Sequence, residues 1–283
     1  MSNNKLAMIM LDGLRFDAAV EQMGYLGHLV EKGLASRYCV KSEIPSLSRP
    51  LYEVLLTGTP PYRNGITTNQ TVRLSQQESL FHLTKRNGLT NATASYYWVS
   101  ELYNRAPFVI HEDRIQHNPE KVIQHGIFYF EDHYPDSHLF ADAHHLLTAY
   151  HPDFLYVHSM NIDDIGHKFT ANSKEYKGSV LMADSILATV IPAWMEKGYQ
   201  IIVTADHGMN DDGNHGGTLN DVRHVPLFII SDQVEPGVYE EEISQLMIAP
   251  ISCQLLRIKP SASMIPLSLP GIKAKELQFE ERK

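Results

Sequence analysis

Four continuous apolar runs mark the chain, and each lies close to acidic or histidine residues. They occupy residues 6–11, 154–158, 200–204 and 225–230. Runs of this length are typical of strands that are buried on both faces, as in a parallel sheet. Because parallel strands place their carboxyl ends at one edge of the sheet, the polar side chains that follow these runs are expected to lie together there.

Segments with helical periodicity separate the runs. They occupy residues 20–32, 49–57, 79–87, 137–150, 173–196 and 241–256. The long segment at 173–196 has boundary signals at both ends, Ser173 at its start and Gly198 just beyond it. This alternation predicts a doubly wound α/β fold, with a mostly parallel central sheet, helices on both faces and residues 1–283 in one domain.

Residues 67–135 interrupt this rhythm because their periodicity is weak and they are rich in polar and aromatic residues, such as Tyr97 and Trp98. One interpretation is a set of surface loops with a peripheral helix or two. The other is a small cap that covers the functional site and selects the substrate. The last dozen residues, which end in the charged run 280–283, are expected to form a solvated tail.

The composition is that of a soluble globular protein, with 43% hydrophobic and 20% charged residues. A net charge of −9 argues against an extended surface for nucleic acid or for an anionic membrane. The first apolar run is too short for a signal peptide or a membrane span, and no other segment is expected to cross a bilayer. The expected location is therefore the cytoplasm. Oligomeric state is not predicted.

The two cysteines, Cys39 and Cys253, lie far apart in the sequence and in apolar surroundings. They are interpreted as reduced core residues, which is the common situation for free cysteine. A single disulfide between them remains the alternative.

The side chains near the apolar runs form a complete set of ligands for two adjacent metal ions. The set comprises Asp12, Asp163, His167, Asp206, His207 and His215. A mixture of carboxylate and imidazole suits zinc or manganese better than calcium, which prefers oxygen ligands alone. One ion is assigned to the group that contains Asp12 and Asp206, together with His207, and the second to Asp163, His167 and His215. Two ions about 4 Å apart can stabilise charge on both sides of an in-line displacement.

Ser48 is the predicted nucleophile. It precedes Arg49 and Pro50 and an apolar helical stretch, and proline is favoured just inside a helix start. Ser48 is therefore expected at the N-cap, where the positive end of a helix attracts phosphate. A serine there is most often only a cap, but beside the ligand set it is assigned as nucleophile and as a ligand of the first ion. The Arg49 side chain is assigned to an anionic oxygen of the substrate, with a solvated arginine as an equal alternative. The backbone N–H of Arg49 is the safer assignment for an oxyanion donor.

These residues, in this order, resemble the alkaline phosphatase superfamily, and within it the type I phosphodiesterase and nucleotide pyrophosphatase branch. In that family an aspartate follows the first strand, a threonine or serine nucleophile opens a helix, and Asp-x-x-Gly-His, Asp-His-Gly and His-Gly motifs follow. The matching positions here are Asp12, Ser48, Asp163 with His167, Asp206 with His207, and His215. The segment 57–66 also resembles the family's segment after the nucleophile helix, and the resemblance spans about residues 6–70 and 153–230.

The resemblance implies an alkaline phosphatase-like fold and two divalent ions, zinc by analogy and manganese as the alternative. It implies hydrolysis of a small phosphoester, a phosphodiester or nucleotide pyrophosphate, through a phosphoseryl intermediate on Ser48. A phosphonate hydrolase of the phosphonoacetate type and a phosphomonoesterase remain alternatives on the same metal centre. A sulfatase is less favoured, because Tyr52 stands where sulfatases carry an arginine. A non-catalytic metal-binding protein is the alternative from another class.

Overall fold

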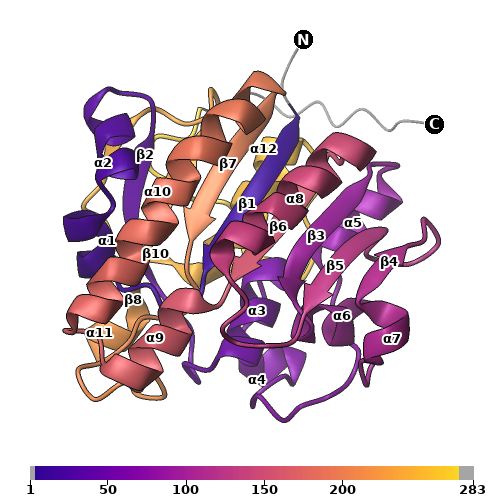
Figure 1. Cartoon of the computed structure of the whole chain (residues 1–283). Coiled ribbons are helices and arrows are strands. Elements are labelled where there is room, and N and C mark those ends of the chain that lie inside the picture. The colour runs from indigo at the N-terminus through magenta and orange to yellow at the C-terminus, as the bar shows by residue number, and fades with distance from the viewer. Residues whose placement is uncertain (1–3, 274–283) are drawn as a thin grey trace.

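The computed structural model describes residues 4–273, and in that part of the chain ten strands form one sheet (Figure 1). The spatial order is β10-β2-β8-β7-β1-β6-β3-β5-β4, with β9 beside β2. In sequence order the bounds are β1 Lys5–Leu11, β2 Ser36–Lys41, β3 Asn91–Tyr96, β4 Ile115–His117, β5 His125–Tyr129, β6 Phe154–Ser159, β7 Tyr199–Thr204, β8 His224–Ile230, β9 Gly237–Val238 and β10 Ile243–Ser244. Most of the predicted charged tail lies outside the described residues.

The centre of the sheet is parallel, as predicted. β1 pairs in parallel with β6 and β7, and β3 pairs in parallel with β6 and β5. β8 is an exception, because it runs antiparallel to both β7 and β2. The expectation that residues 225–230 form a parallel strand was therefore wrong. The only helix between β7 and β8 is the short α11 (Asn220–Arg223), so this connection returns at the edge that it left and does not cross the sheet.

Helices cover both faces of the sheet, which confirms the predicted layers (Figure 1). α8 and α10 pack on β3, β6 and β7 at the front of the view, with α2 against α10. On the other face, α12 packs on β1 and α5 on β3. The remaining bounds are α1 Phe16–Gln22, α2 Gly24–Glu31, α3 Ser48–Thr57, α4 Pro61–Asn64, α5 Leu80–Arg86, α6 Trp98–Tyr103, α7 Ile110–Asp113, α8 Asp136–Tyr150, α9 Asn161–Phe169, α10 Lys174–Glu196 and α12 Ile248–Leu256, which follows the 3₁₀ turn Gln245–Met247.

The segment 67–135 differs from both interpretations of it, because three of the strands of the central sheet lie within it. β3 has no continuous apolar run, because some of its fully buried residues are polar, among them Asn91 and Thr93. Hydrogen bonds satisfy these side chains: Thr93 Oγ1 donates to the carbonyl of Tyr156 at 2.9 Å, and Asn91 Nδ2 donates to the carbonyl of Phe81 at 3.1 Å. A buried polar group is tolerated in a core when it is paired in this way.

α10 is long and apolar enough to cross a membrane by length and composition, contrary to the expectation that no segment is. In the fold it lies along the sheet against β7, with α8, α9 and α2 as neighbours. Both cysteines are free, so the alternative of a disulfide between Cys39 and Cys253 is not realised.

The register of β1 aligns its end with the ends of β6 and β7. All six residues of the run 6–11 are fully buried in the middle of the sheet. Met10 lies opposite Thr204 of β7, and Leu11 lies opposite Ser159 of β6. The segments that follow β1, β6 and β7 therefore begin at the same level and converge on one edge.

Candidate metal centre

The first cluster joins the ends of β1 and β7. Asp12 follows β1, and Asp206 with His207 follow β7, so the parallel register places all three together. His207 Nε2 lies 3.3 Å from Asp12 Oδ1 and 3.2 Å from Asp206 Oδ2. The backbone N–H of Gly13 donates to Asp206 Oδ1 at 3.3 Å. All three side chains of the cluster are fully buried.

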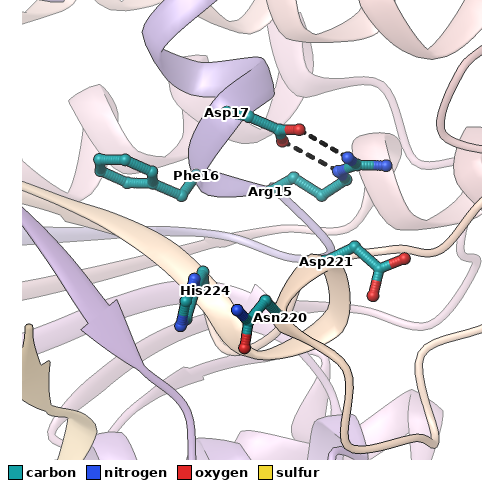
Figure 2. Close-up of a pocket in the computed structure, with 6 residues that line it drawn as sticks. All are labelled: Arg15, Phe16, Asp17, Asn220, Asp221 and His224. Carbon is teal, nitrogen blue, oxygen red and sulfur yellow. Dashed lines mark hydrogen bonds and ion pairs between the residues drawn. The ribbon is translucent and has the colours of Figure 1, made fainter.

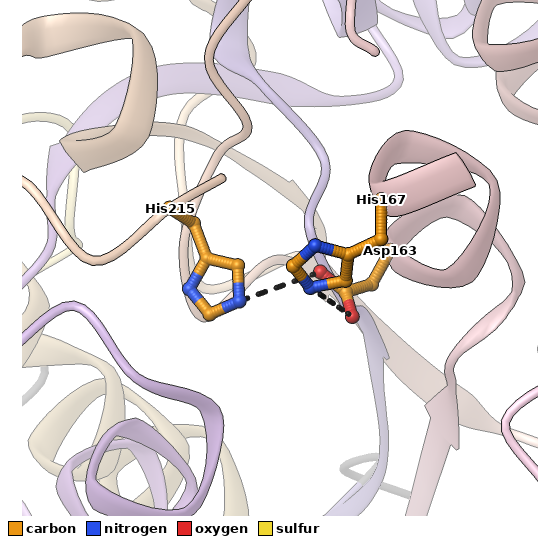
Figure 3. A group of neighbouring side chains, drawn as sticks. All are labelled: Asp163, His167 and His215. Atoms are coloured by element: carbon orange, nitrogen blue, oxygen red, sulfur yellow. Dashed lines mark ion pairs between the residues drawn. The ribbon is translucent and has the colours of Figure 1, made fainter. Parts of the chain in front are cut away.

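The second cluster lies beside the first and combines α9 with the loop before α11 (Figure 3). Asp163 and His167 are one helical turn apart on α9, so they project from the same face. His167 Nε2 lies 3.4 Å from Asp163 Oδ2, and His215 Nε2 lies 3.8 Å from Asp163 Oδ1. The rings of His207 and His215 stack with their centroids 3.6 Å apart, which makes the two clusters neighbours.

Each of the three histidines points its Nε2 atom inward because a backbone carbonyl holds its Nδ1 atom. His167 Nδ1 lies 2.8 Å from the carbonyl of Gly213, and His215 Nδ1 lies 2.9 Å from that of Ser46. His207 Nδ1 lies 2.9 Å from the carbonyl of Gly208. A carbonyl only accepts hydrogen bonds, so the proton belongs on Nδ1 and the Nε2 lone pair is free to bind a cation.

The carboxylates fit the same arrangement. Asp12 Oδ1, Asp163 Oδ1 and Asp206 Oδ2 are buried and have no hydrogen-bond partner in the described part of the chain. They face bare imidazole nitrogens, which are acceptors too, so a shared cation is what would satisfy both sides.

The pKa shifts of the cluster residues also favour a bound cation. Burial, with the nearby Asp206 carboxylate, raises the pKa of Asp12, and burial, with Asp163, raises that of Asp206. Burial also lowers the pKa of His215 to about 2, which keeps its imidazole neutral. The donor set of each cluster, with its ligand atoms within 4.8 Å of one another, therefore fits a divalent cation.

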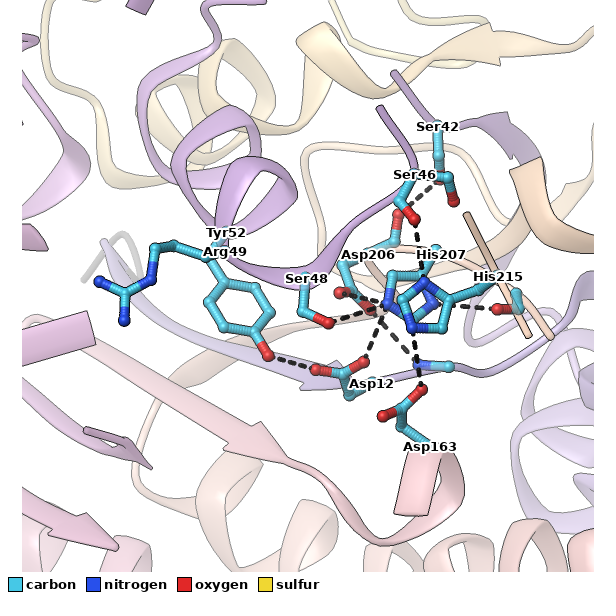
Figure 4. Close-up of polar contacts among 12 residues, drawn as sticks. Asp12, Ser42, Ser46, Ser48, Arg49, Tyr52, Asp163, Asp206, His207 and His215 are labelled. Atoms are coloured by element: carbon cyan, nitrogen blue, oxygen red, sulfur yellow. Dashed lines mark hydrogen bonds and ion pairs between the residues drawn. The ribbon is translucent and has the colours of Figure 1, made fainter. Parts of the chain in front are cut away.

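Ser48 lies at the first cluster (Figure 4). Its Oγ atom is 3.1 Å from His207 Nε2, and only 5% of the residue is exposed. α3 begins at Ser48 itself and Leu47 is the N-cap, one residue earlier than predicted. The hydroxyl is thus directed to the cluster and not to capping, at the N-terminal end of α3, where the helix dipole favours an anion.

Arg49 does not have the role that was assigned to its side chain. Its guanidinium is buried and turned away from the clusters (Figure 4). It donates to Glu101 Oε2 at 2.7 Å and to the carbonyl of Thr71, and it lies 4.5 Å from the centre of the Trp98 ring. The backbone N–H of Arg49 donates to Asn69 Oδ1 at 3.1 Å. A structural ion pair therefore replaces the predicted substrate contact of the side chain, and the backbone N–H that was predicted as an oxyanion donor binds Asn69 Oδ1.

Two residues of the centre were missed by the sequence analysis. Tyr52 and His158 both contact Asp12 Oδ2, the tyrosine through its hydroxyl and the histidine through Nε2 at 3.0 Å. Tyr52 is one turn after Ser48 on α3, and His158 is in the apolar run of β6. A histidine inside a buried strand was the signal available for one of them.

Other polar residues near the predicted ligands have partners of their own. Asp164 pairs with Lys168 at 2.6 Å, and Asp211 pairs with Arg15 at 3.1 Å. His224 pairs with Glu242 at 2.7 Å. Neither cluster includes these side chains.

A pocket of about 260 Å³ lies between the start of α1 and the start of β8 (Figure 2). It is lined by Arg15, Phe16, Asp17, Asn220, Asp221 and His224. Arg15 is turned toward Asp17 in it, with its guanidinium 2.5 Å from the carboxylate. None of the side chains in the two clusters lines this pocket, so it is separate from the centre.

Comparison with known proteins places the fold. Murine ectonucleotide pyrophosphatase/phosphodiesterase 5 superposes with a TM-score of 0.73 at 12% identity, over 93% of this chain and 97% of that one. Phosphonate monoester hydrolase from Silicibacter pomeroyi superposes with a TM-score of 0.67 at 14% identity, over 95% and 76% of the two chains. The predicted alkaline phosphatase-like α/β fold is confirmed.

Sequence comparison adds a relative and a family. The catalytic subunit of human GPI ethanolamine phosphate transferase 2 is 23% identical over 251 residues, which cover 83% of this chain and 24% of the relative. The chain thus spans about a quarter of the length of that relative. The model of the type I phosphodiesterase/nucleotide pyrophosphatase family matches residues 6–233. Because that match covers most of the chain and includes the segments of both clusters, the chain belongs to the type I phosphodiesterase/nucleotide pyrophosphatase family.

Proposed function

We propose that this chain cleaves phosphodiesters through a phosphoseryl intermediate on Ser48, with two divalent ions held by the two clusters. One observation carries the proposal: the Ser48 hydroxyl lies at the start of a helix and 3.1 Å from a predicted metal ligand, His207 Nε2. A serine needs a base or a metal to become a good nucleophile. Family membership supports phosphoester chemistry at this hydroxyl.

Zinc is the proposed ion, with manganese as the alternative. Mixed carboxylate and imidazole donors, few in number and partly held by backbone carbonyls, are typical of catalytic zinc sites. Two such ions, when bound, would act as Lewis acids that lower the pKa of an attached hydroxyl or water and offset charge on phosphoryl oxygens.

The protein contributes a nucleophile and a place for the phosphoryl group. Ser48 Oγ forms a bond to phosphorus while the bond from phosphorus to the leaving alcohol oxygen breaks. The serine proton passes to solvent, and the leaving oxygen takes up a proton from water. A water molecule then forms the next bond to phosphorus, the Oγ–phosphorus bond breaks, and the serine hydroxyl is restored. The positive end of the α3 helix dipole favours the negative phosphoryl oxygens throughout.

The charge around the centre supports a diester over a monoester. Each basic residue on the segments that carry the clusters and Ser48 already has a partner within the described residues. Arg15 pairs with Asp17 and Asp211, Arg49 with Glu101, and Lys168 with Asp164, while the Arg223 guanidinium donates to the carbonyl of Ser42. A phosphodiester carries one negative charge, whereas a monoester carries up to two and would need a further cation. Pairing of these side chains leaves the ions as the main source of positive charge.

Transfer to an alcohol in place of water is a second candidate, because the human relative is named an ethanolamine phosphate transferase. Both reactions share the first step on Ser48 and differ in the acceptor of the second. Phosphonate esters are a third candidate for the substrate, and they belong in the same test.

The test uses bis-p-nitrophenyl phosphate, p-nitrophenyl phosphate and p-nitrophenyl phenylphosphonate with zinc or manganese. We expect wild type to cleave the diester fastest and Ser48→Ala to lose turnover, while metal analysis shows that the carboxylate and histidine ligands of the clusters still bind metal. Ser46→Ala is the matched control, because Ser46 is also buried but its hydroxyl donates to the carbonyl of Val222. Acid quenching of wild type should trap a phosphorylated peptide that contains Ser48.

Addition of glycerol separates the two acceptors, since a transferase yields a glycerol phosphodiester and a hydrolase yields the free phosphomonoester. Faster cleavage of the monoester than of the diester would replace the proposal with a phosphatase. Loaded protein that cleaves none of the three compounds, or a Ser48→Ala variant that turns over normally, would contradict the proposed mechanism.

A further inference from the structure

The two oxygens of the Asp12 carboxylate have different surroundings. Oδ2 contacts the hydroxyl of Tyr52 and lies 3.0 Å from His158 Nε2. Oδ1 has no hydrogen-bond partner in the described chain and lies 3.3 Å from His207 Nε2. One oxygen is therefore held by the protein and the other is directed into the first cluster.

The donors on Oδ2 can be assigned from chemistry. An ionised carboxylate only accepts hydrogen bonds, so the Tyr52 hydroxyl and the His158 Nε2–H must both donate to it. Tyr52, His158 and Asp12 are all fully buried, so water does not compete for these contacts. The His158 ring meets the Tyr52 ring edge-on at 4.5 Å between centroids, which fixes both donors in place. Two donors occupy the two lone pairs of Oδ2, and only Oδ1 remains for a cation.

The partner carboxylate shows the same division. Asp206 Oδ1 accepts the backbone N–H of Gly13, and Asp206 Oδ2 has no partner in the described chain. One atom each from Asp12, Asp206, His207 and Ser48 then makes four donor atoms at the first cluster. Zinc is commonly bound by four ligands, whereas manganese, magnesium and calcium take more oxygens.

We propose that Tyr52 and His158 are positioning residues that limit Asp12 to one ligand oxygen and thereby give the first cluster its preference for zinc over manganese. This inference rests on the metal centre of the proposed function. Tyr52 also joins that centre to the nucleophile, because it is one turn after Ser48 on the same helix. Loss of its hydroxyl frees Oδ2 to bind as a second ligand atom and removes the contact between α3 and Asp12, which follows β1.

The test measures metal binding and not only turnover. Tyr52→Phe and His158→Phe each remove one donor and keep an aromatic ring, while His158→Gln keeps a donor near the position of Nε2. Tyr103→Phe is the matched control, because the buried Tyr103 hydroxyl donates to another carboxylate, Glu53 Oε2, at 2.7 Å. Dissociation constants for zinc and for manganese are measured by chelator competition, and the visible spectrum of the cobalt-substituted protein reports the number of ligands.

We expect zinc affinity to fall about tenfold or more in Tyr52→Phe and His158→Phe, with a smaller loss for manganese, so that the preference for zinc narrows. The cobalt absorption should weaken, as expected when four-coordinate cobalt gains ligands. His158→Gln should lie closer to wild type than His158→Phe does, and Tyr103→Phe should match wild type. If one phenylalanine variant does not fold, the other and the comparison of His158→Gln with wild type still decide the outcome.

Unchanged zinc-to-manganese preference and cobalt spectra in the phenylalanine variants would overturn the inference while the metal centre stands. A wild type that binds no zinc at the first cluster would instead remove the centre itself, and the proposed function with it. The two failures are therefore distinguishable.

Discussion

The guanidinium of Arg49 lies 2.7 Å from a carboxylate oxygen of Glu101, although Arg49 directly follows the predicted nucleophile in the sequence. Both side chains are buried, and the Trp98 ring covers the guanidinium at 4.5 Å. The pair joins the start of α3 to α6, which lies in the segment 67–135, for which the sequence left two interpretations. It therefore supports the position of Ser48 and holds the guanidinium away from the two clusters.

Removal of Arg49 should cost stability. Arg49→Met leaves Glu101 as an uncompensated buried charge, and we expect the free energy of unfolding to fall by about 3–5 kcal/mol in denaturant titrations. The double variant Arg49→Met/Glu101→Gln should recover part of that loss, because no charge is left without a partner. Unchanged stability of Arg49→Met together with a raised KM would return Arg49 to substrate binding.

Gly13 controls the approach of the two clusters. Its φ of +74° is one that other residues rarely adopt, and a Cβ atom there would lie 2.9 Å from Asp163 Cα and 3.0 Å from Asp163 Oδ1. We expect Gly13→Ala to displace Asp163 and to reduce the bound metal from two ions per chain to one, as measured by metal analysis of the purified protein. Gly27→Ala in α2 is the control, since nothing lies within 4 Å of the position that its added methyl group would take and helix propensity favours alanine. Two ions retained in Gly13→Ala would contradict this role of the contact.

Glu53 should make stability dependent on pH. Burial raises its pKa from 4.5 to about 7, although Ser75 and Tyr103 donate to it. A carboxyl whose pKa is raised by folding contributes stability that is complete below pH 4.5 and is lost as pH rises through 7. The loss relative to Glu53→Gln should reach about 3 kcal/mol at pH 8. If the free energies of unfolding of wild type and variant changed in parallel between pH 5 and pH 8, Glu53 would instead ionise normally.

The two clusters should release metal at different rates. The side chain of His167 is 43% exposed, whereas Asp12, Asp206 and His207 are fully buried. We expect a chelator to remove zinc in two phases, with the fast phase from the cluster of His167. His167→Ala should abolish the fast phase and leave the slow one. Release in a single phase from wild type would mean that the clusters exchange metal together.

The parts of the centre that could be predicted from the sequence are those that follow from an apolar run or from a helical spacing. The runs before Asp12 and Asp206 are central strands, and parallel pairing aligns Met10 with Thr204, so their polar successors meet. The i, i+4 spacing of Asp163 and His167 on α9 places both on one face. Such patterns can be read from the sequence because the direction of side chains repeats with a fixed period in any helix and in any strand.

Features that depend on tertiary contacts could not be predicted. Nothing local to Arg49 reveals Glu101, 52 positions later, as its partner. The same holds for His158, whose contact with Asp12 arises from the pairing of β6 with β1. β3 was missed for another reason, since its buried positions include Asn91 and Thr93, whose hydrogen bonds exist only in the assembled sheet.

The antiparallel direction of β8 determines how three ligands of the centre are carried by the chain. A parallel strand in its place would require the chain to travel to the far edge of the sheet, but β8 lets it leave β7 and come back at the same edge. Asp206, His207 and His215 are thus carried on one excursion, residues 205–223, which is anchored at both ends by neighbouring strands. Because both ends of that excursion lie at the same edge of the sheet, the strand order sets no fixed length for it, in contrast to a crossover connection between parallel strands.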